Sequence, residues 1–177
     1  VRFSLTTNAT LLEPDDAELL ARHRTQVAVS IDGSKSVNDA VRPMNDGGSS
    51  YDRLIRGLQL FEKHGRPYHL SARITVTPKF KDLLSILDHV LSLGFDSAGF
   101  SPVLVSPDPS QALEQSDFDW MLEGMIASGQ KAQQSILIGK RYSFSNFETA
   151  LQEIDRGSHR PYPCGAGAAY LSVSADG

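Results

Sequence analysis

Apolar and polar positions along the chain switch repeatedly between the period of a β-strand and that of an α-helix. Alternating or β-branched apolar runs predict strands at 3–8, 26–31, 68–77 and 98–103. Strands that alternate with helices predict an α/β fold with a parallel sheet, and four such βα units form a partial (βα) barrel. The expected helices cover 14–23, the stretch from the cap at 49–52 to Gly65, the stretch around 83–90 that Gly94 ends, a helix that starts near Ser116 or Asp117 and carries Trp120, Met121, Met125 and Ile126 toward the core, and 146–155.

The two faces of each expected strand differ in polarity. Alternate residues of a strand point to opposite sides of a sheet, so one face of each strand is apolar and the other is polar or small. The polar faces carry Ser4, Thr6, Asn8, Ala28, Ser30, Asp32, Ser71, Arg73, Thr75, Thr77, Gly99 and Ser101. Because helices must cover the apolar faces, we expect the polar faces to converge inside the barrel, where bulky branched side chains ordinarily lie. This interior is predicted to hold a ligand.

Polar residues also stand at the carboxyl ends of the expected strands, where α/β proteins place their chemistry. These residues are Asn8, Asp32 and Thr77. Each of them also suits a helix cap or a turn. An inward Arg73 needs a partner, and the candidates are Asp32, as a simple internal salt bridge, or a bound carboxylate.

Composition and charge exclude several classes of protein. The 177 residues include 21 acidic and 17 basic side chains, for a formal net charge of −4. The basic residues are scattered, which argues against a nucleic-acid partner, and no apolar run is long enough to cross a membrane. The single cysteine, Cys164, cannot form an internal disulfide, and no secretory signal is evident, so we expect a cytoplasmic protein.

Both ends of the chain suggest a piece of a longer protein. The chain begins with Val1 inside a strand-like run, and the alternating stretch 170–174 precedes an Asp-Gly turn at 176–177 with no returning strand. A piece of this kind is expected to expose apolar surface at its first strand and at the open hairpin. A dimer through these strand edges is one expected consequence.

Four short motifs lie at and after the end of the second expected strand: Ser-Ile-Asp-Gly at 30–33, Asn-Asp at 38–39, Arg-Pro at 42–43 and Gly-Gly-Ser-Ser-Tyr-Asp at 47–52. Together they resemble the stretch after the fourth barrel strand in radical S-adenosylmethionine (SAM) enzymes that carry a SPASM domain. Thr-Asn-Ala-Thr-Leu-Leu at 7–12 resembles their third-strand motif, and Pro-Cys-Gly-Ala-Gly at 163–167 resembles the opening of the SPASM region. Each motif alone is weak, but their order matches along nearly the whole chain.

The resemblance implies a fold and a function. It implies a partial radical SAM barrel over 1–157 and the truncated start of a SPASM hairpin over 158–177. The most similar families are anaerobic sulfatase-maturating enzymes, quinohemoprotein amine dehydrogenase maturation proteins and six-cysteine peptide maturases. By this likeness the parent protein is an iron–sulfur oxidoreductase that binds SAM and [4Fe-4S] clusters and modifies a peptide or protein by hydrogen-atom abstraction.

The resemblance also implies roles for individual residues. Ser30 is expected beside the ribose of SAM, and Arg42 on the carboxylate of its methionine part, with Asn8 nearby. Asp32 is expected either at the cofactor or as a local cap. The cap interpretation is favoured for Asp39. Arg73 and Thr75 are expected to contact cofactor or substrate.

The sequence lacks the cysteines that the family uses for catalysis. The catalytic cluster is held by a C-x3-C-x2-C loop after the first barrel strand, and this chain has no such loop. Cys164 is at best a ligand of an auxiliary cluster in the parent, and otherwise an idle thiol. The chain by itself is therefore expected to be inactive and to hold no bound cofactor.

Two other classes of function remain open from the sequence. One is a non-catalytic half-barrel that presents its polar interior to a peptide as a binding or scaffold module. The other is part of a metal-independent barrel lyase or isomerase. The five histidines share no ligand-like spacing, so no metal is assigned to them.

Overall fold

The computed structural model describes residues 3–157. Cys164, the expected strand at 170–174 and the proposed SPASM region at 158–177 lie outside the described residues.

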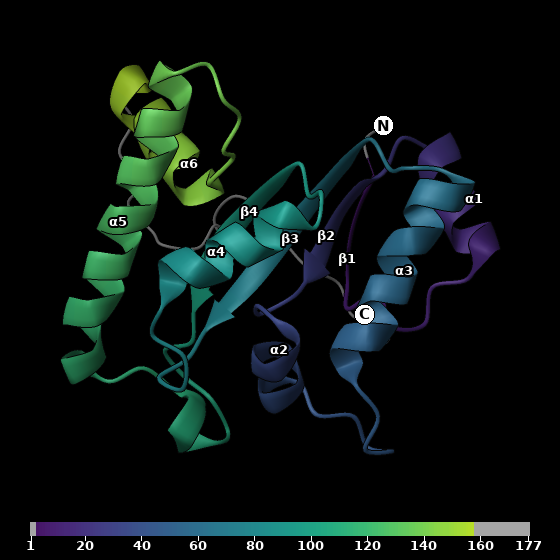
Figure 1. The fold of residues 1–177 in the computed structure, drawn as a ribbon, viewed down its shortest axis with the longest axis horizontal. Helices are drawn as coiled ribbons and strands as arrows, with labels where there is room; N and C mark the ends of the chain where they lie inside the picture. The colour runs from purple at the N-terminus through teal and green to yellow at the C-terminus, as the bar shows by residue number, and fades with distance from the viewer. Residues whose placement is uncertain (1–2, 158–177) are drawn as a thin grey trace, which may run out of the picture.

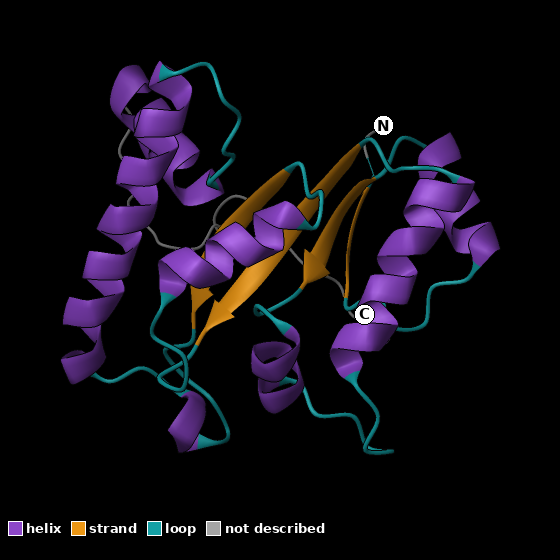
Figure 2. Cartoon of the chain, viewed as in Figure 1, coloured by secondary structure: helices purple, strands orange, loops and turns teal. Residues whose placement is uncertain are grey.

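A four-stranded parallel sheet forms the centre of the described chain (Figure 2). The strands pair in sequence order, β1-β2-β3-β4, as expected for consecutive strands of a partial (βα) barrel. In the register, Val29 lies opposite Ala72 and Ser30 lies opposite Arg73. The strand bounds are Ser4–Thr7 (β1), Gln26–Ser30 (β2), His69–Val76 (β3) and Ser97–Pro102 (β4).

The helices are distributed around this sheet in a clear order (Figure 1). Helices α1, α3 and α4 lie on one side of the sheet, α2 lies beyond the carboxyl ends of the strands, and α5 packs against α4. The bounds are Pro14–Arg22 (α1), Lys35–Val41 (α2), Ser50–His64 (α3), Leu83–Ser92 (α4), Phe118–Leu137 (α5) and Ser145–Arg156 (α6), with short 3-10 turns at Pro109–Gln111 (η1) and Gln115–Asp117 (η2).

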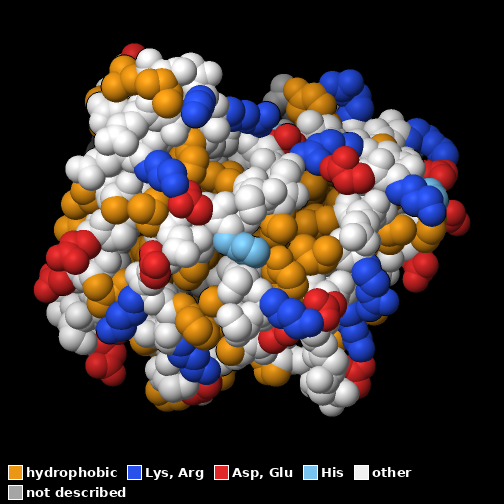
Figure 3. All heavy atoms as spheres, in the orientation of Figure 1, with side chains coloured by type: hydrophobic (Ala, Val, Ile, Leu, Met, Phe, Trp, Pro, Cys, Tyr) orange, Lys and Arg blue, Asp and Glu red, His pale blue; other side chains and the backbone are white. Residues whose placement is uncertain are grey.

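The apolar faces of the inner strands form the core, as the alternation predicts. Apolar side chains of β2, β3 and β4 are buried against the helices, while their polar neighbours other than Ser97 stay at least partly accessible. Figure 3 shows apolar side chains gathered between the helices of the covered side, with Lys, Arg, Asp and Glu mostly around them. The buried strand residues are Val27, Val29, Leu70, Ala72, Ile74, Val76, Ala98 and Phe100.

The edge strand β1 behaves differently from the inner strands. Phe3 is 51% exposed and Leu5 is 41% exposed, although the alternation places them on the apolar side. Only β2 pairs with β1, so one edge of β1 has no neighbour among the described residues. The expected apolar surface at the first strand is therefore present.

Helix α2 was not expected from the apolar pattern. It has only seven residues, and its apolar side chains are limited to Val37, Ala40 and Val41. Asn38, in its middle, is buried and bonded to residues on both sides, so tertiary contacts rather than periodicity fix this helix.

Helix α5 fits its prediction only in part. Trp120, Met121 and Met125 pack against the core as expected, but Ile126 is 50% exposed and does not. The reason is that α5 packs against α4 along one side, which covers only a narrow stripe of the helix. Within the described residues, no helix is both long enough and apolar enough to span a bilayer.

A polar cluster joins α4, α5 and the segment before α6. The Asp88 carboxylate accepts hydrogen bonds from Lys131 Nζ at 2.7 and 2.6 Å and from the Tyr142 hydroxyl at 2.8 Å. Burial and this carboxylate together raise the pKa of Tyr142. The cluster therefore keeps Tyr142 as a hydrogen-bond donor that ties the chain after α5 to α4.

Candidate functional site

Asp32 and Arg42 form an ion pair at the carboxyl ends of β2 and β3, in which the carboxylate is buried and the guanidinium is partly exposed. Arg42 Nε lies 2.5 Å from Asp32 Oδ2, and Arg42 Nη2 lies 3.1 Å from Asp32 Oδ1. Asp32 is only 1% exposed, and its Oδ1 also accepts the backbone N–H of Thr75 at 2.8 Å. Arg42 Nη2 donates further to the Thr75 hydroxyl at 2.9 Å. This two-point pair fixes the plane of the guanidinium.

Helix α2 carries Arg42 to this position. Asn38 Oδ1 accepts the backbone N–H of Asp32 at 3.0 Å, and Asn38 Nδ2 donates to the Ser50 hydroxyl at 3.0 Å. One buried side chain therefore links the end of β2 to the start of α3. Arg42 follows directly at the carboxyl end of α2.

Asp39 caps the following helix, which confirms the structural interpretation of this residue. Its carboxylate accepts hydrogen bonds from the hydroxyls of Ser49 (2.7 Å) and Ser50 (3.0 Å) and from the backbone N–H of Tyr51 (2.9 Å). Burial opposes ionisation, but these donors stabilise the charge more strongly, so the pKa of Asp39 is lowered. Asp39 therefore orders the first turn of α3.

Arg73 does not pair with Asp32, which corrects one of the two expected partnerships. Arg73 Nε donates to the Ser101 hydroxyl of β4 at 3.0 Å, and the side chain is exposed. The reason is competition, since Arg42 and the Thr75 backbone already occupy both oxygens of Asp32. Arg73 is thus left without an acidic partner among the described residues.

The other expected site residues lie along the same polar edge. Ser30 is partly buried and lies opposite Arg73 in the register. Asn8 follows β1 and is exposed, and its Oδ1 accepts hydrogen bonds from the backbone N–H (3.2 Å) and the hydroxyl (2.9 Å) of Thr10. The structure thus brings Arg42 and Thr75 into contact, with Ser30 on the neighbouring strand and Asn8 in a local turn after β1.

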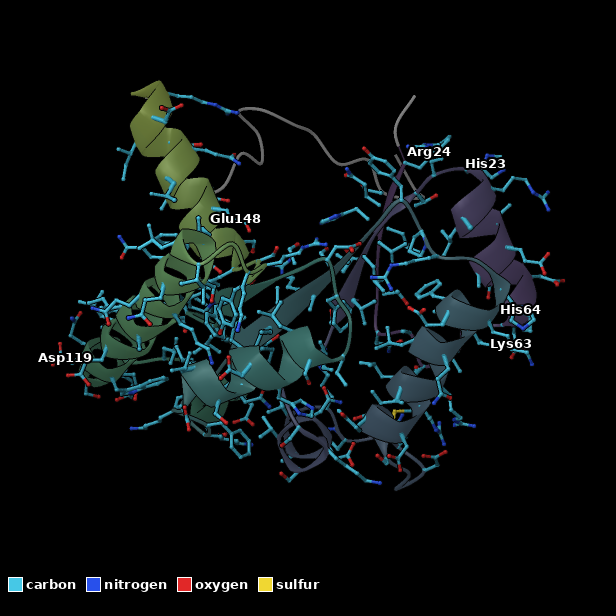
Figure 4. All side chains as sticks on the ribbon, turned by 45° about the horizontal axis from the view of Figure 1, so that its top comes forward. His23, Arg24, Lys63, His64, Asp119 and Glu148 are labelled. Atoms are coloured by element: carbon cyan, nitrogen blue, oxygen red, sulfur yellow. The ribbon has the colours of Figure 1, made fainter. Side chains whose placement is uncertain are left out.

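The described residues do not fit an iron–sulfur cluster. They contain no cysteine, and among residues 3–157 no group of three or more His, Cys, Asp and Glu side chains is arranged to bind a metal ion. In Figure 4, His23 and His64 lie at the outer margin of the molecule, at the ends of α1 and α3.

More than half of the chain, residues 1–101, matches the family model of the radical SAM superfamily. The chain belongs to this superfamily. The matched region contains β1, β2, β3 and the ion pair of Asp32 with Arg42.

Two curated relatives extend this assignment. An uncharacterized protein of Archaeoglobus fulgidus is 28% identical over 188 residues, which cover 99% of this chain and 42% of the relative. A serine-type anaerobic sulfatase-maturating enzyme of Klebsiella aerogenes is 27% identical over 101 residues, which cover 57% of this chain and 25% of that enzyme. The chain spans less than half the length of either relative.

Two solved structures share the fold. Native anSMEcpe, solved with bound AdoMet and the Kp18Cys peptide, matches with a TM-score of 0.74 at 22% identity, over 88% of this chain and 43% of that one. SuiB of Streptococcus suis, solved with S-adenosylmethionine, matches with a TM-score of 0.59 at 16% identity, over 82% and 32% of the two chains. These matches confirm the expected α/β architecture.

Two supporting residues were missed from the sequence. Asn38 appeared only as part of a family-like dipeptide, and Ser101 only as a polar-face residue of the fourth strand. The position of Ser101 near Arg73 could have been inferred from strand alternation, because both residues lie on the polar face of the sheet. In the register, Ser101 is two positions from Gly99, the partner of Arg73. For Asn38 no local signal existed, because its partners lie six and twelve residues away.

Proposed function

We propose that the protein to which this chain belongs is a radical SAM enzyme that modifies a peptide or protein by hydrogen-atom abstraction. Membership of the superfamily supports radical chemistry. The peptide or protein substrate is supported by the sulfatase-maturating relative and by the solved neighbour that was crystallised with a peptide. When bound, the cofactor supplies an adenosyl radical, and the protein supplies position and shape.

The observation that carries this proposal is that the Arg42 guanidinium is only partly occupied by hydrogen-bond acceptors. Its Nε and Nη2 atoms are committed to Asp32 and Thr75, while Nη1 has no acceptor among the described residues. The side chain is 31% exposed at the carboxyl edge of the sheet. A guanidinium that is fixed on one edge and open on the other suits the carboxylate of the methionine part of SAM.

The remaining contacts follow the same edge. Ser30 offers a hydroxyl that both donates to and accepts from a ribose diol, and Asn8 lies beyond the neighbouring strand β1. Asp32 acts by holding Arg42 rather than by contacting SAM. The [4Fe-4S] cluster requires cysteines outside residues 3–157, and Cys164 is proposed as an auxiliary ligand at the start of a SPASM region over 158–177.

The test uses the complete gene product, purified without oxygen and incubated with SAM and dithionite. The expected result is iron and sulfide in the protein and formation of 5′-deoxyadenosine, measured by mass spectrometry. A full-length protein without iron and without 5′-deoxyadenosine would show that the proposal is wrong.

The role of Arg42 is tested separately by calorimetric titration of SAM. Arg42→Lys keeps the charge but loses the two-point pair, and we expect at least a tenfold weaker affinity for SAM. Arg56→Lys is the matched control, because Arg56 is exposed on α3 and takes no part in the proposed site. Equal affinities for the two variants would contradict the assignment.

A further inference from the structure

A hollow of about 470 Å³ lies on the polar side of the sheet, next to the site described above. Strands β3 and β4 form its floor, and the first turns of α6 form its wall. Arg73 lines it, and the lining residues within 3–157 include no Asp or Glu. Because a guanidinium stays protonated, these described walls carry a positive charge with no carboxylate to balance it.

Arg73 is oriented in this hollow without being neutralised. Its neighbours along the strand, Ala72 and Ile74, are buried on the helix side, so strand alternation places Arg73 on the opposite side. The Nε atom is held by the Ser101 hydroxyl at 3.0 Å. Both terminal amino groups lack an acceptor among the described residues and are available to a ligand.

Hydroxyl groups surround this cation. They can donate to an anion, and the first turn of α6 adds its own backbone N–H groups, since Phe144 provides no side-chain cap. Gly99 permits this approach, because a Cβ atom there would lie 2.1 Å from the Ser145 hydroxyl. The lining hydroxyls belong to Ser71, Ser97, Ser101, Ser145 and Thr149.

The carboxylate of Asp96, which lies near the lining residue His69, is already engaged elsewhere. His69 Nε2 lies 3.1 Å from the Ser97 hydroxyl, and its Nδ1 lies 3.8 Å from Asp96 Oδ2. Asp96 accepts the backbone N–H of Leu70 at 2.7 Å and lies 3.3 Å from Arg66. Its carboxylate is therefore not available to Arg73.

We infer that this hollow binds a carboxylate of the substrate, with Arg73 as the residue that selects it. A single guanidinium with hydroxyl donors suits one carboxylate rather than a polyanion. The inference rests on the proposed function, since Thr75 bonds to Arg42 and lies two residues from Arg73 on the same face. At about 7 Å along the strand, a carboxylate at Arg73 sits beside the proposed SAM site.

The carboxylate has two sources in a peptide, an acidic side chain and the C-terminus. The full 177-residue chain, labelled with ¹⁵N, is titrated with N-acetyl-glutamate amide, N-acetyl-alanine and the neutral N-acetyl-glutamine amide. We expect the Nε–H resonance of Arg73 to shift with a carboxylate probe and not with the glutamine probe. The tighter of the two carboxylate probes identifies the source.

Variants separate this site from general charge attraction. Arg73→Gln is expected to weaken binding of the tighter carboxylate probe at least tenfold, whereas Arg56→Gln removes the same charge from the surface of α3 and should leave it unchanged. If Arg73→Gln does not fold, the test uses the affinity of Arg73→Lys for the same probe and the shift of the Arg73 Nε–H resonance in the unmodified chain. Equal binding of the glutamate and glutamine probes, or an equal loss in both variants, would overturn the inference.

The SAM-cleavage assay of the full-length protein, run beside the carboxylate titration, distinguishes the two proposals. Carboxylate binding at Arg73 together with a failure of the full-length protein to cleave SAM overturns the proposed function and leaves a carboxylate site. Cleavage of SAM without carboxylate binding overturns the site alone.

Discussion

Arg42 and Arg73 both reach the polar side of β3, one from the end of α2 and the other from the strand itself. Arg42 is paired at two points with a buried carboxylate, and Arg73 has a single hydrogen bond to a serine. The pairing with Asp32 fixes the orientation of the Arg42 guanidinium but neutralises its charge. The hydrogen bond to serine leaves the charge of Arg73 available to a ligand. The sheet thus presents one guanidinium built for position and another built for attraction.

The largest expected effect is on stability, when each arginine is removed. Arg42→Ala leaves the buried Asp32 without its cation, so we expect a loss of about 3 kcal/mol in the free energy of unfolding. Arg73→Ala, at an exposed site, is expected to change it by less than about 0.5 kcal/mol. Urea unfolding followed by circular dichroism measures both. Equal losses would mean that the two arginines do not differ as described.

The second effect concerns the wall of the Arg73 hollow. Gly99→Ala places a methyl group against the Ser145 hydroxyl, so this side chain must rotate away or α6 must shift, and we expect a loss of about 1 kcal/mol. Gly129→Ala is the control. Gly129 lies within helix α5, and a Cβ atom added there would meet only the Phe147 ring of α6, at 3.3 Å. There the better helix propensity of alanine should prevent any loss of stability. Thermal unfolding compares the two, and an unchanged Gly99→Ala variant would contradict the tight contact.

A third, smaller effect is the pH dependence of the free energy of unfolding that arises from Asp39, which links α2 to the start of α3. The pKa of Asp39 is lowered in the folded state, so its ionised form stabilises the fold above its ordinary pKa of about 4. This contribution is lost as the pH falls through the folded-state pKa. Asp39→Asn should therefore flatten the acid limb of a plot of unfolding free energy against pH. An acid limb as steep as that of the unmodified chain would contradict this role.

The smallest effect is expected from Ser101→Ala, which removes only the hydrogen bond that orients Arg73. Stability should change by less than about 0.5 kcal/mol, because the lost hydrogen bond is to the exposed side chain of Arg73. Binding of N-acetyl-glutamate amide should weaken roughly two- to fivefold, in line with one lost hydrogen bond. Nuclear magnetic resonance titration measures this, and unchanged binding would show that Ser101 does not position the guanidinium.

Much of the fold was accessible from the sequence, because strand alternation and helical spacing are local properties. The apolar faces of β2, β3 and β4 and the starts of α1 and α3 follow from them. Helix α2 did not, because its stability depends on Asn38 bonding to distant residues. The exposed Ile126 shows the same limit, since the width of the covered stripe depends on what packs beside α5.

For the site, the sequence by itself determined which side chains share a face, because the pleat of a strand fixes the direction of every second residue. The sequence thus placed Ser30, Arg73 and Thr75 on one face of the sheet and identified Asp32 and Arg42 as charged candidates for the site. Only the tertiary structure decided the pairing, giving Asp32 to Arg42 and leaving Arg73 to Ser101. The physical reason is that a buried carboxylate has few acceptor positions. Which donors lie within hydrogen-bond distance of them depends on how the helices and strands pack together.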